Sequence, residues 1–378
     1  MLRCLLLIAL LGICLSLPAS KTKLQKQLKP LRLHRILPSE GEQTKRYNDD
    51  IFVMGMSMAV GSGQRQTPEF RVDLTKGDLE VRMCTDGLEP LKGEQNFCFN
   101  PKWSKTYVQL SKELAMDTFH APHLIDRIDN FTLPNTTFVA ENKTLYDVEY
   151  PSGCSGSVGI GWPSLAKHPQ TYFPFKYMEH ETPNHQHLMF FVISMSGCGA
   201  YHGYGEGCDI MENGEEPYYV PTTSQGYWQF ALHGIKYGSI NQPLAAQAVI
   251  SSTKGFIGLP KKYLNNMMST YGIKWDGLYN AYTVNCSRFS FLPNFEFMVD
   301  GKTLVIEPKI YVYTYKPLMN GRCVVYFEDS KQFGFGPDFY FGLPLLQSYC
   351  MEFDFDNKKI GFAKNQIFCQ QNCGCTHQ

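Results

Sequence analysis

The sequence predicts a mainly β protein, and two observations carry this prediction. From about residue 49 onward, short apolar or alternating runs are separated by Gly, Pro, Asn and Asp. The chain also contains 26 Phe and 22 Tyr, residue types that favour the half-buried surface of a pleated sheet. Examples of the expected strands are Phe70–Val72, Leu188–Ser194, Tyr227–Leu232, Phe295–Val299, Lys309–Tyr315 and Met351–Phe355.

Helix is predicted at few positions. The best candidate is Pro260–Thr270, which begins with a proline as helix N-termini permit, whereas Asn100–Thr106 forms one turn at most. Two Gly-bearing loops, near Lys76 and near Ser252, hint at a long internal repeat.

The first 46 residues have the composition of targeting and processing segments. Arg3 precedes an apolar run that ends near Leu15, too short for the roughly 20 residues of a spanning helix. We therefore expect a signal peptide over residues 1–16 and no transmembrane segment, with delivery to the extracellular space or to a lysosomal or luminal compartment. A basic pro-segment-like region over residues 17–46 follows and ends in the dibasic pair Lys45-Arg46; the alternative is a basic tail that is never removed.

The charge distribution argues against nucleic acid as a partner. The chain has 35 basic and 35 acidic residues in total. Nine of the bases but only two of the acids precede Tyr47, so a chain that begins at Tyr47 carries about seven excess negative charges. Such a balance does not favour binding to a polyanion.

Cysteines and glycan acceptors fit the secretory route. Eleven of the thirteen cysteines remain after the signal peptide, and disulfides are the default in an oxidising compartment. Since eleven is odd, at least one thiol should be free or paired with another chain. The N-glycosylation acceptor pattern Asn-x-Ser/Thr occurs at Asn130, Asn135, Asn142 and Asn285.

Four segments, in order, are similar to the pepsin-like aspartic peptidases. They are FNPKWSKTYVQL from Phe99, SVGIGWPSLA from Ser157, PYYVPTTSQGYWQFALHGI from Pro217 and FGLPLLQSYCMEFDFDNKKIGFA from Phe341. The resemblance implies a bilobal fold in which two β-barrel-like lobes flank a central cleft. We expect the lobes over residues 49–222 and 223–378, the second with a Cys-rich tail. The resemblance also implies the disulfides Cys84–Cys98 and Cys286–Cys323, while other pairings stay open.

The resemblance implies a catalytic site that this sequence lacks. Members of the family use two Asp residues, one per lobe, each in a loop written Asp-Thr/Ser-Gly, and the pair shares a proton and activates a water. Aligned by its glycine, FRVDLTKGDLEV puts Thr75 at the first Asp. Aligned by its FIGLP end, AVISSTKGFIGLP puts Ser251 at the second. A hydroxyl group cannot serve as the base at any relevant pH.

Substitute acids are available for one position only. Asp73 or Asp78 could stand in for the first Asp, but no Asp or Glu occurs between residues 217 and 275 to replace the second. The family's flap, a hairpin that closes over substrate with a Tyr-Gly pair, corresponds to KELAMDTFHAPHL, where Thr118 and Phe119 occupy the pair. Both degenerate loops also carry a lysine, which predicts either a cationic cleft or two solvent-facing side chains.

Metal and cofactor sites are not expected. In HETPNHQH the two histidines of an HExxH-like motif are five residues apart instead of four, and Pro183 interrupts any helix. The tail CQQNCGCTHQ could form a Cys₃His zinc site, but disulfides are favoured in an oxidising compartment. A serine-hydrolase motif, Gly-x-Ser-x-Gly, is absent.

Three classes of function therefore stay open. The leading hypothesis is a secreted, glycosylated pseudopeptidase that binds a protein or peptide in or near the cleft, with a receptor, a protease or a small ligand as further candidates. The alternative is a divergent aspartic-type endopeptidase. A storage or structural protein is the third.

Overall fold

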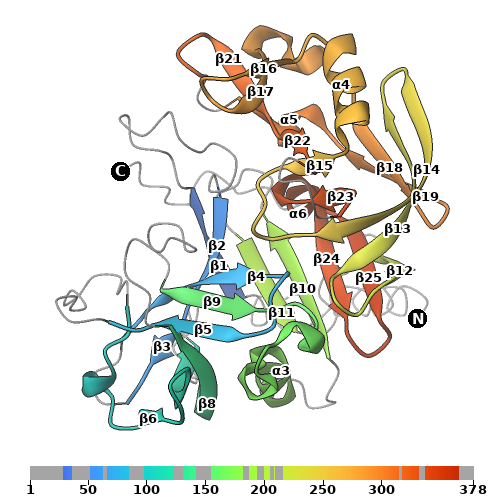
Figure 1. Ribbon diagram of the computed structural model, residues 1–378. Helices are drawn as coiled ribbons and strands as arrows, with labels where there is room; N and C mark the ends of the chain where they lie inside the picture. The colour runs from blue at the N-terminus through green and yellow to red at the C-terminus, as the bar shows by residue number, and fades with distance from the viewer. Residues whose placement is uncertain are drawn as a thin grey trace, which may run out of the picture.

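The fold is mainly β and divides into two lobes (Figure 1). The computed structural model describes residues 29–35, 52–62, 66–84, 98–121, 131–141, 155–181, 187–193, 200–204, 208, 216–314, 317–331 and 337–365. The predicted signal peptide, most of the HETPNHQH loop and the tail cysteines lie outside these residues. The first lobe contains β3–β9 and α3, and the second contains β13–β23 with α4 and α5.

One large sheet runs through the first lobe and joins it to the second. Its order is β12-β25-β24-β10-β11-β1-β2-β4-β9-β5-β8-β7-β3, with β6 paired to β7. Its strands are β1 Lys29–Arg35, β2 Phe52–Ser57, β3 Ala59–Val60, β4 Glu69–Asp73, β5 Leu79–Arg82, β6 Val108–Gln109, β7 Leu114–Ala121, β8 Phe131–Glu141, β9 Gly156–Gly159, β10 Leu188–Ile193, β11 Ala200–Tyr204, β12 Tyr218–Pro221, β24 Tyr349–Asp354 and β25 Lys359–Lys364.

The second lobe is built on two smaller sheets. The seven-stranded sheet has the order β19-β18-β13-β14-β23-β15-β22, and the four-stranded sheet has the order β16-β17-β21-β20. Their strands are β13 Gln229–Tyr237, β14 Ile240–Ile250, β15 Ile257–Leu259, β16 Lys274–Asp276, β17 Ala281–Asn285, β18 Phe295–Val299, β19 Lys302–Ile306, β20 Val312–Tyr313, β21 Arg322–Val325, β22 Phe327–Asp329 and β23 Phe339–Phe341.

Helices are short and lie mainly at the edges of the sheets. The α-helices are α3 Phe173–Glu181, α4 Lys261–Thr270, α5 Pro308–Tyr311 and α6 Leu343–Ser348, and the 3₁₀ turns are η1 Pro101–Trp103, η2 Pro163–Leu165, η3 Pro169–Thr171 and η4 Cys286–Phe291. Helix α4 matches the predicted helix and buries Leu264, Met267 and Met268 against the second lobe.

One predicted strand is wrong in its first half. Residues 309–311 belong to α5, and only Val312–Tyr313 form a strand, β20. Pro308 explains the difference, because a proline at the first helical position already has a helical φ and its missing N–H costs no hydrogen bond there.

The two lobes repeat one pattern of strand pairing. In the first lobe β9 pairs in parallel with β4 and antiparallel with β5, and β5 pairs in parallel with β8. In the second lobe β23 pairs in parallel with β14 and antiparallel with β15, and β15 pairs in parallel with β22. This correspondence supports the internal repeat that the two Gly-bearing loops suggest, and it brings the ends of β4 and β14 into equivalent positions.

Strand β1 comes from the region predicted to be a pro-segment. It lies between β11 and β2 in the large sheet and pairs antiparallel with both, from Lys29↔His202 at one end to Arg35↔Phe52 at the other. The chain then passes from β12, in the large sheet, to β13, in the second lobe; the lobe boundary between residues 222 and 223 stays a prediction. Strands β24 and β25 return to the large sheet.

Buried aromatic side chains fill the core of both lobes. Trp228 is fully buried at the junction, 4.6 Å between ring centroids from Trp162 and 4.8 Å from Phe353, and its indole N–H donates to the Ile160 carbonyl at 3.3 Å. The tryptophan of the segment PYYVPTTSQGYWQFALHGI therefore packs the lobes together. A smaller buried cluster surrounds the Cys208–Cys350 disulfide.

Candidate functional site

Two equivalent loops follow β4 and β14. Each contains the triplet Thr-Lys-Gly, at residues 75–77 and 253–255. In the first lobe the N–H of Gly161 donates to the Lys76 carbonyl at 2.8 Å, and in the second the N–H of Leu343 donates to the Lys254 carbonyl at 2.8 Å. The loops are thus held by matching backbone hydrogen bonds. Two residues before the threonine of each triplet stand Asp73 in the first lobe and Ser251 in the second.

The hydroxyl group of Ser252 joins the two loops. It donates to the Val72 carbonyl at 2.9 Å and accepts from the Leu74 N–H at 2.9 Å, and all of these atoms are buried. Since Val72 and Leu74 flank Asp73, the second loop contacts the first on either side of this acid. Asp73 is 2% exposed and Ser251 is 4% exposed.

This geometry moves the first acid position by two residues. The sequence alignment puts Thr75 there, but the strand pairing and the Ser252 bridge put Asp73 there. The physical reason is the spacing of the glycine: Gly77 lies four positions after Asp73, as Gly255 lies four positions after Ser251. An alignment that places Gly77 two positions after the acid therefore chooses Thr75. The shared Thr-Lys-Gly triplet is the signal that would have placed Asp73 opposite Ser251.

The Asp73 carboxylate is surrounded by donors from its own segment. Its Oδ1 accepts from the N–H of Thr75 at 2.8 Å and from the Thr75 hydroxyl at 2.6 Å. Its Oδ2 accepts from Nη2 of Arg71 at 3.2 Å, so the acid is paired with a cation that is itself only 15% exposed.

Ser251 contacts the threonine two residues later, as Asp73 does, with a hydroxyl in place of the carboxylate. Its Oγ accepts from the N–H of Thr253 at 3.3 Å and lies 3.2 Å from the Thr253 hydroxyl. Residue 253 therefore relates to residue 251 as Thr75 relates to Asp73. The two equivalent positions carry one acid and one neutral hydroxyl group.

Asp78, the other candidate for the first acid, has a structural role: its carboxylate holds a neighbouring loop through hydrogen bonds. Its carboxylate accepts from the N–H groups of Lys167 and His168 at 3.0 and 3.1 Å and from the Thr171 hydroxyl at 2.7 Å. These contacts fix the loop before α3.

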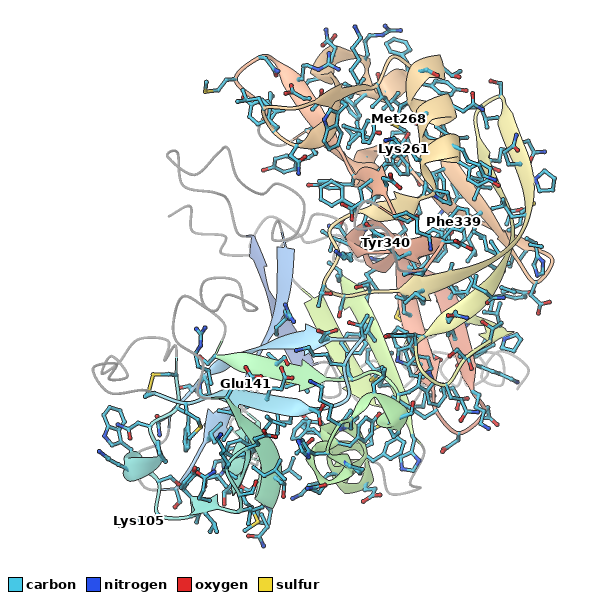
Figure 2. All side chains as sticks on the ribbon, in the orientation of Figure 1. Lys105, Glu141, Lys261, Met268, Phe339 and Tyr340 are labelled. Carbon is cyan, nitrogen blue, oxygen red and sulfur yellow. A yellow bond between two sulfur atoms is a disulfide. The ribbon has the colours of Figure 1, made fainter. Side chains whose placement is uncertain are left out.

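The two loop lysines do not form a common cationic site. Nζ of Lys76 lies 2.9 Å from Oε2 of the buried Glu80, which also accepts from the Ser157 hydroxyl at 2.6 Å. Lys254 lies over the ring of Tyr340, 5.8 Å from its centroid. Figure 2 shows Tyr340 in the second lobe.

The flap-equivalent residues lie on β7. Phe119 is 1% exposed and packs against Phe70, Phe138 and Phe173 at centroid distances of 6.2, 5.7 and 6.3 Å. Thr118 is half-buried, and its carbonyl accepts from the N–H of Gly61 at 2.8 Å. Phe119 thus forms part of the first lobe's core, where its ring cannot close over a ligand.

Three disulfides lie in the described part of the chain. Cys84–Cys98 and Cys286–Cys323 are the two pairings that the resemblance implied, and Cys208–Cys350 is a third that spans 142 residues. Of the predicted glycan acceptors, Asn135 and Asn285 are described and exposed, whereas Asn130 and Asn142 lie outside the described residues.

Neither a metal site nor a membrane span is found among the described residues. They contain no group of three or more His, Cys, Asp or Glu side chains that could hold a metal ion. His187, from the HETPNHQH motif, instead pairs with Asp356, Nδ1 to Oδ1 at 2.9 Å. In the same residues, no helix combines the length and apolar character needed to cross a membrane.

The fold and the two matched loops define the class of protein. Residues 87–365 match the model of the eukaryotic aspartyl protease family, and the chain belongs to this family. The predicted bilobal pepsin-like fold is therefore confirmed.

Named relatives come from a nematode and a mammal. Aspartic protease 10 of Caenorhabditis elegans is 25% identical over 330 residues, which cover 82% of this chain and 75% of that protein. Aspartic protease 17 of the same organism is 28% identical over 222 residues, and the match covers 55% of this chain and about half, 54%, of the relative. Gastricsin of Oryctolagus cuniculus is 24% identical over 280 residues, 70% of each chain.

Proposed function

We propose that this chain is a secreted binding protein with the aspartyl protease fold and without endopeptidase activity. One observation carries the proposal: where the two loops meet, the buried equivalent positions hold a carboxylate, Asp73, and a hydroxyl group, Ser251. We propose Asp73, in place of Thr75, as the first position, which the Ser252 bridge to Val72 and Leu74 supports; one acid is then absent instead of both.

A single acid at this site is insufficient for the chemistry. Hydrolysis by the family requires one carboxylate to take a proton from water while a second, protonated carboxyl polarises the peptide carbonyl. Ser251 can do neither at the pH of interest, and the Asp73 carboxylate already accepts from Thr75 and Arg71. An acid–base group contributes roughly 10²–10⁴-fold to a rate, so the loss of one removes most turnover.

The groups near the two positions are suited to binding. The Thr75 hydroxyl donates to Asp73 and can still accept a hydrogen bond, as a peptide N–H requires. The Ser251 and Thr253 hydroxyls share one hydrogen bond between them and leave one donor for a peptide C=O. We therefore propose a protein or peptide as the partner, bound in or near the cleft between the lobes. Secretion is supported by the three disulfides, which form and persist in oxidising compartments.

A cleavage assay tests the proposal against its alternative, a divergent aspartic-type endopeptidase like those the relatives' names describe. The purified protein is incubated with a denatured protein substrate between about pH 3 and 7, with and without a pepstatin-type inhibitor. We expect no cleavage above that of an Asp73→Asn variant. Pepstatin-sensitive cleavage that Asp73→Asn abolishes would favour the enzyme.

The partner is sought by affinity capture from the fluid in which the protein occurs, followed by mass spectrometry. A captured peptide or protein is then titrated against the wild type and the Asp73→Asn variant in a direct binding measurement. Binding by both proteins, without cleavage of the partner, is the expected result.

A further inference from the structure

Asn285 combines an exposed position with a defined side-chain geometry. It ends β17 and caps η4, and its Oδ1 accepts from the N–H of Ser287 at 3.0 Å and from the Ser287 hydroxyl at 2.9 Å. Within the described structure its Nδ2 makes no hydrogen bond. The amide oxygen therefore faces the backbone turn, and the amide nitrogen is available to solvent.

The same three residues, Asn285-Cys286-Ser287, form an acceptor pattern for N-linked glycan. A glycan attaches to the amide nitrogen and leaves the amide oxygen in place, so the cap on η4 survives the modification. We propose that Asn285 carries an N-linked glycan. In this reaction the Nδ2 atom bonds to C1 of a lipid-linked oligosaccharide, the C1–O bond to the lipid pyrophosphate breaks, and Nδ2 loses one proton.

The surface around Asn285 gives the glycan a physical role. Seven large hydrophobic residues are exposed in the described structure, and four of them, Trp275, Leu278, Phe291 and Met319, lie in the segment from β16 to β21. Phe291 ends η4 and is 78% exposed, and Met319 is 86% exposed in the turn that leads into β21, where Arg322 pairs with Asn285. Exposed apolar residues favour association. Phe291 ends the turn that Asn285 caps, and Met319 lies three residues before Arg322, the strand partner of Asn285, so a glycan at Asn285 covers part of this region.

The disulfide at the central residue of the acceptor does not prevent the transfer. Cys286 pairs with Cys323, 37 residues further along the chain. At a synthesis rate of about 5–20 residues per second, Cys323 emerges roughly 2–7 s after the acceptor. The acceptor is therefore extended and accessible before the disulfide closes.

The other described acceptor has a different setting. Asn135 lies on β8 with a left-handed φ of 51°, and its carbonyl and that of Pro134 accept from Nζ of Lys176 at 2.8 and 2.7 Å. Its backbone is thus held against α3, so Asn135 serves as an internal comparison for Asn285.

The test uses the full chain secreted from eukaryotic cells. The protein is digested, treated with an N-glycosidase in ¹⁸O-labelled water and analysed by mass spectrometry. We expect the Asn285 peptide to carry the isotope label in the wild type and in Ser287→Thr, which keeps the acceptor. Asn285→Asp keeps an oxygen for the cap but removes the acceptor nitrogen, and Ser287→Ala removes the acceptor pattern, so each should lose one glycan in intact mass.

The same protein is used to test whether the glycan shields the exposed apolar residues Phe291 and Met319 from self-association. Enzymatic removal of glycans from the wild type should increase self-association in analytical ultracentrifugation, and Phe291→Ser with Met319→Ser should reverse the increase. An unlabelled Asn285 peptide in the secreted protein, or a chain that never enters the secretory pathway, overturns the proposal. An unlabelled Asn285 peptide leaves the proposed function intact, whereas a chain that never enters the secretory pathway also removes the proposed secretion. Neither outcome bears on the proposed absence of peptide cleavage, which the cleavage assay tests separately.

Discussion

The change Ser251→Asp tests whether Asp73 is the partner of Ser251. It places a second carboxylate at a position that is 4% exposed, opposite an acid that is 2% exposed. Two unit charges about 4 Å apart interact by roughly 4 kcal/mol at an effective dielectric constant near 20. Arg71, 3.2 Å from Asp73, offsets part of this repulsion.

The introduced carboxyl should therefore keep its proton to a higher pH in the folded protein than in the unfolded chain, where its pKa is about 3.9. The contribution of a group with a raised folded-state pKa is fully present below its unfolded-state pKa and is lost as the pH rises through the folded-state pKa. The free energy of unfolding of Ser251→Asp, relative to the wild type, should thus fall from about pH 4 upward, by about 1.4 kcal/mol for each unit of pKa displacement.

Urea unfolding of four proteins between pH 3 and 8 provides the assay: the wild type, Ser251→Asp, Asp73→Asn and the double variant. We expect a coupling energy above about 1 kcal/mol at pH 7, which exceeds the 0.3–0.5 kcal/mol non-additivity of distant sites, and a coupling near zero at pH 3. An equal loss of stability in the Asp73→Asn background would refute the reasoning, because the introduced acid would then not face Asp73.

The remaining predictions concern activity, the loop junction, the flap and pH. Ser251→Asp alone should leave cleavage of the denatured protein substrate at background, because Thr253 occupies a position where the family's loop has glycine and the flap pair is replaced. Ser252→Ala should cost about 1–3 kcal/mol in urea unfolding, since it leaves the Val72 carbonyl and the Leu74 N–H buried without their partner, whereas the exposed Ser269→Ala should change stability by less than about 0.5 kcal/mol. Phe119→Ala should cost about 3–5 kcal/mol, against less than about 0.5 kcal/mol for the exposed Phe291→Ala; a small loss at Phe119 would mean that this segment is mobile like a flap. Burial alone would raise the pKa of Asp356, but hydrogen bonds from the backbone and ring of His187, and the imidazole charge, lower it. The resulting stabilisation is present above about pH 4 and is lost as the pH falls through the lowered folded-state pKa, so the difference in unfolding free energy between the wild type and Asp356→Asn should shrink in acid.

Local patterns predicted the elements that depend on near neighbours. Helix α4 follows from a proline start and from apolar residues at helical spacing, and β18 matches its alternation of buried and half-buried residues. The alternation at 309–315 predicts a strand, but Pro308 sets a helical conformation over its first residues.

The identity of the first acid depends on contacts that local patterns do not contain. Asp73 and Thr75 are two residues apart, and a strand residue two positions away lies on the same face. The Ser252 hydroxyl distinguishes the two candidates, because it accepts a hydrogen bond from the N–H of Leu74, the residue after Asp73. Ser252 and Leu74 are 178 residues apart in the sequence. The contact between Glu80 and Ser157 is hidden from local patterns for the same reason, since the two residues become neighbours only when β5 and β9 pair.

Strand β1 has a consequence for what a protease cut after Arg46 would produce. The cut severs the covalent link between β1 and the rest of the sheet, but β1 keeps partners on both sides, Leu31 with Ala200 and Arg32 with Gly55. The product would be a two-chain complex whose stability depends on the concentration of the released peptide. If the peptide departed, β2 and β11 would become two facing edges with unpaired backbone groups, which invite insertion of another strand. Dilution, which promotes dissociation of the peptide, and not the cut itself, would then produce a folded protein that can bind a strand from another chain between β2 and β11.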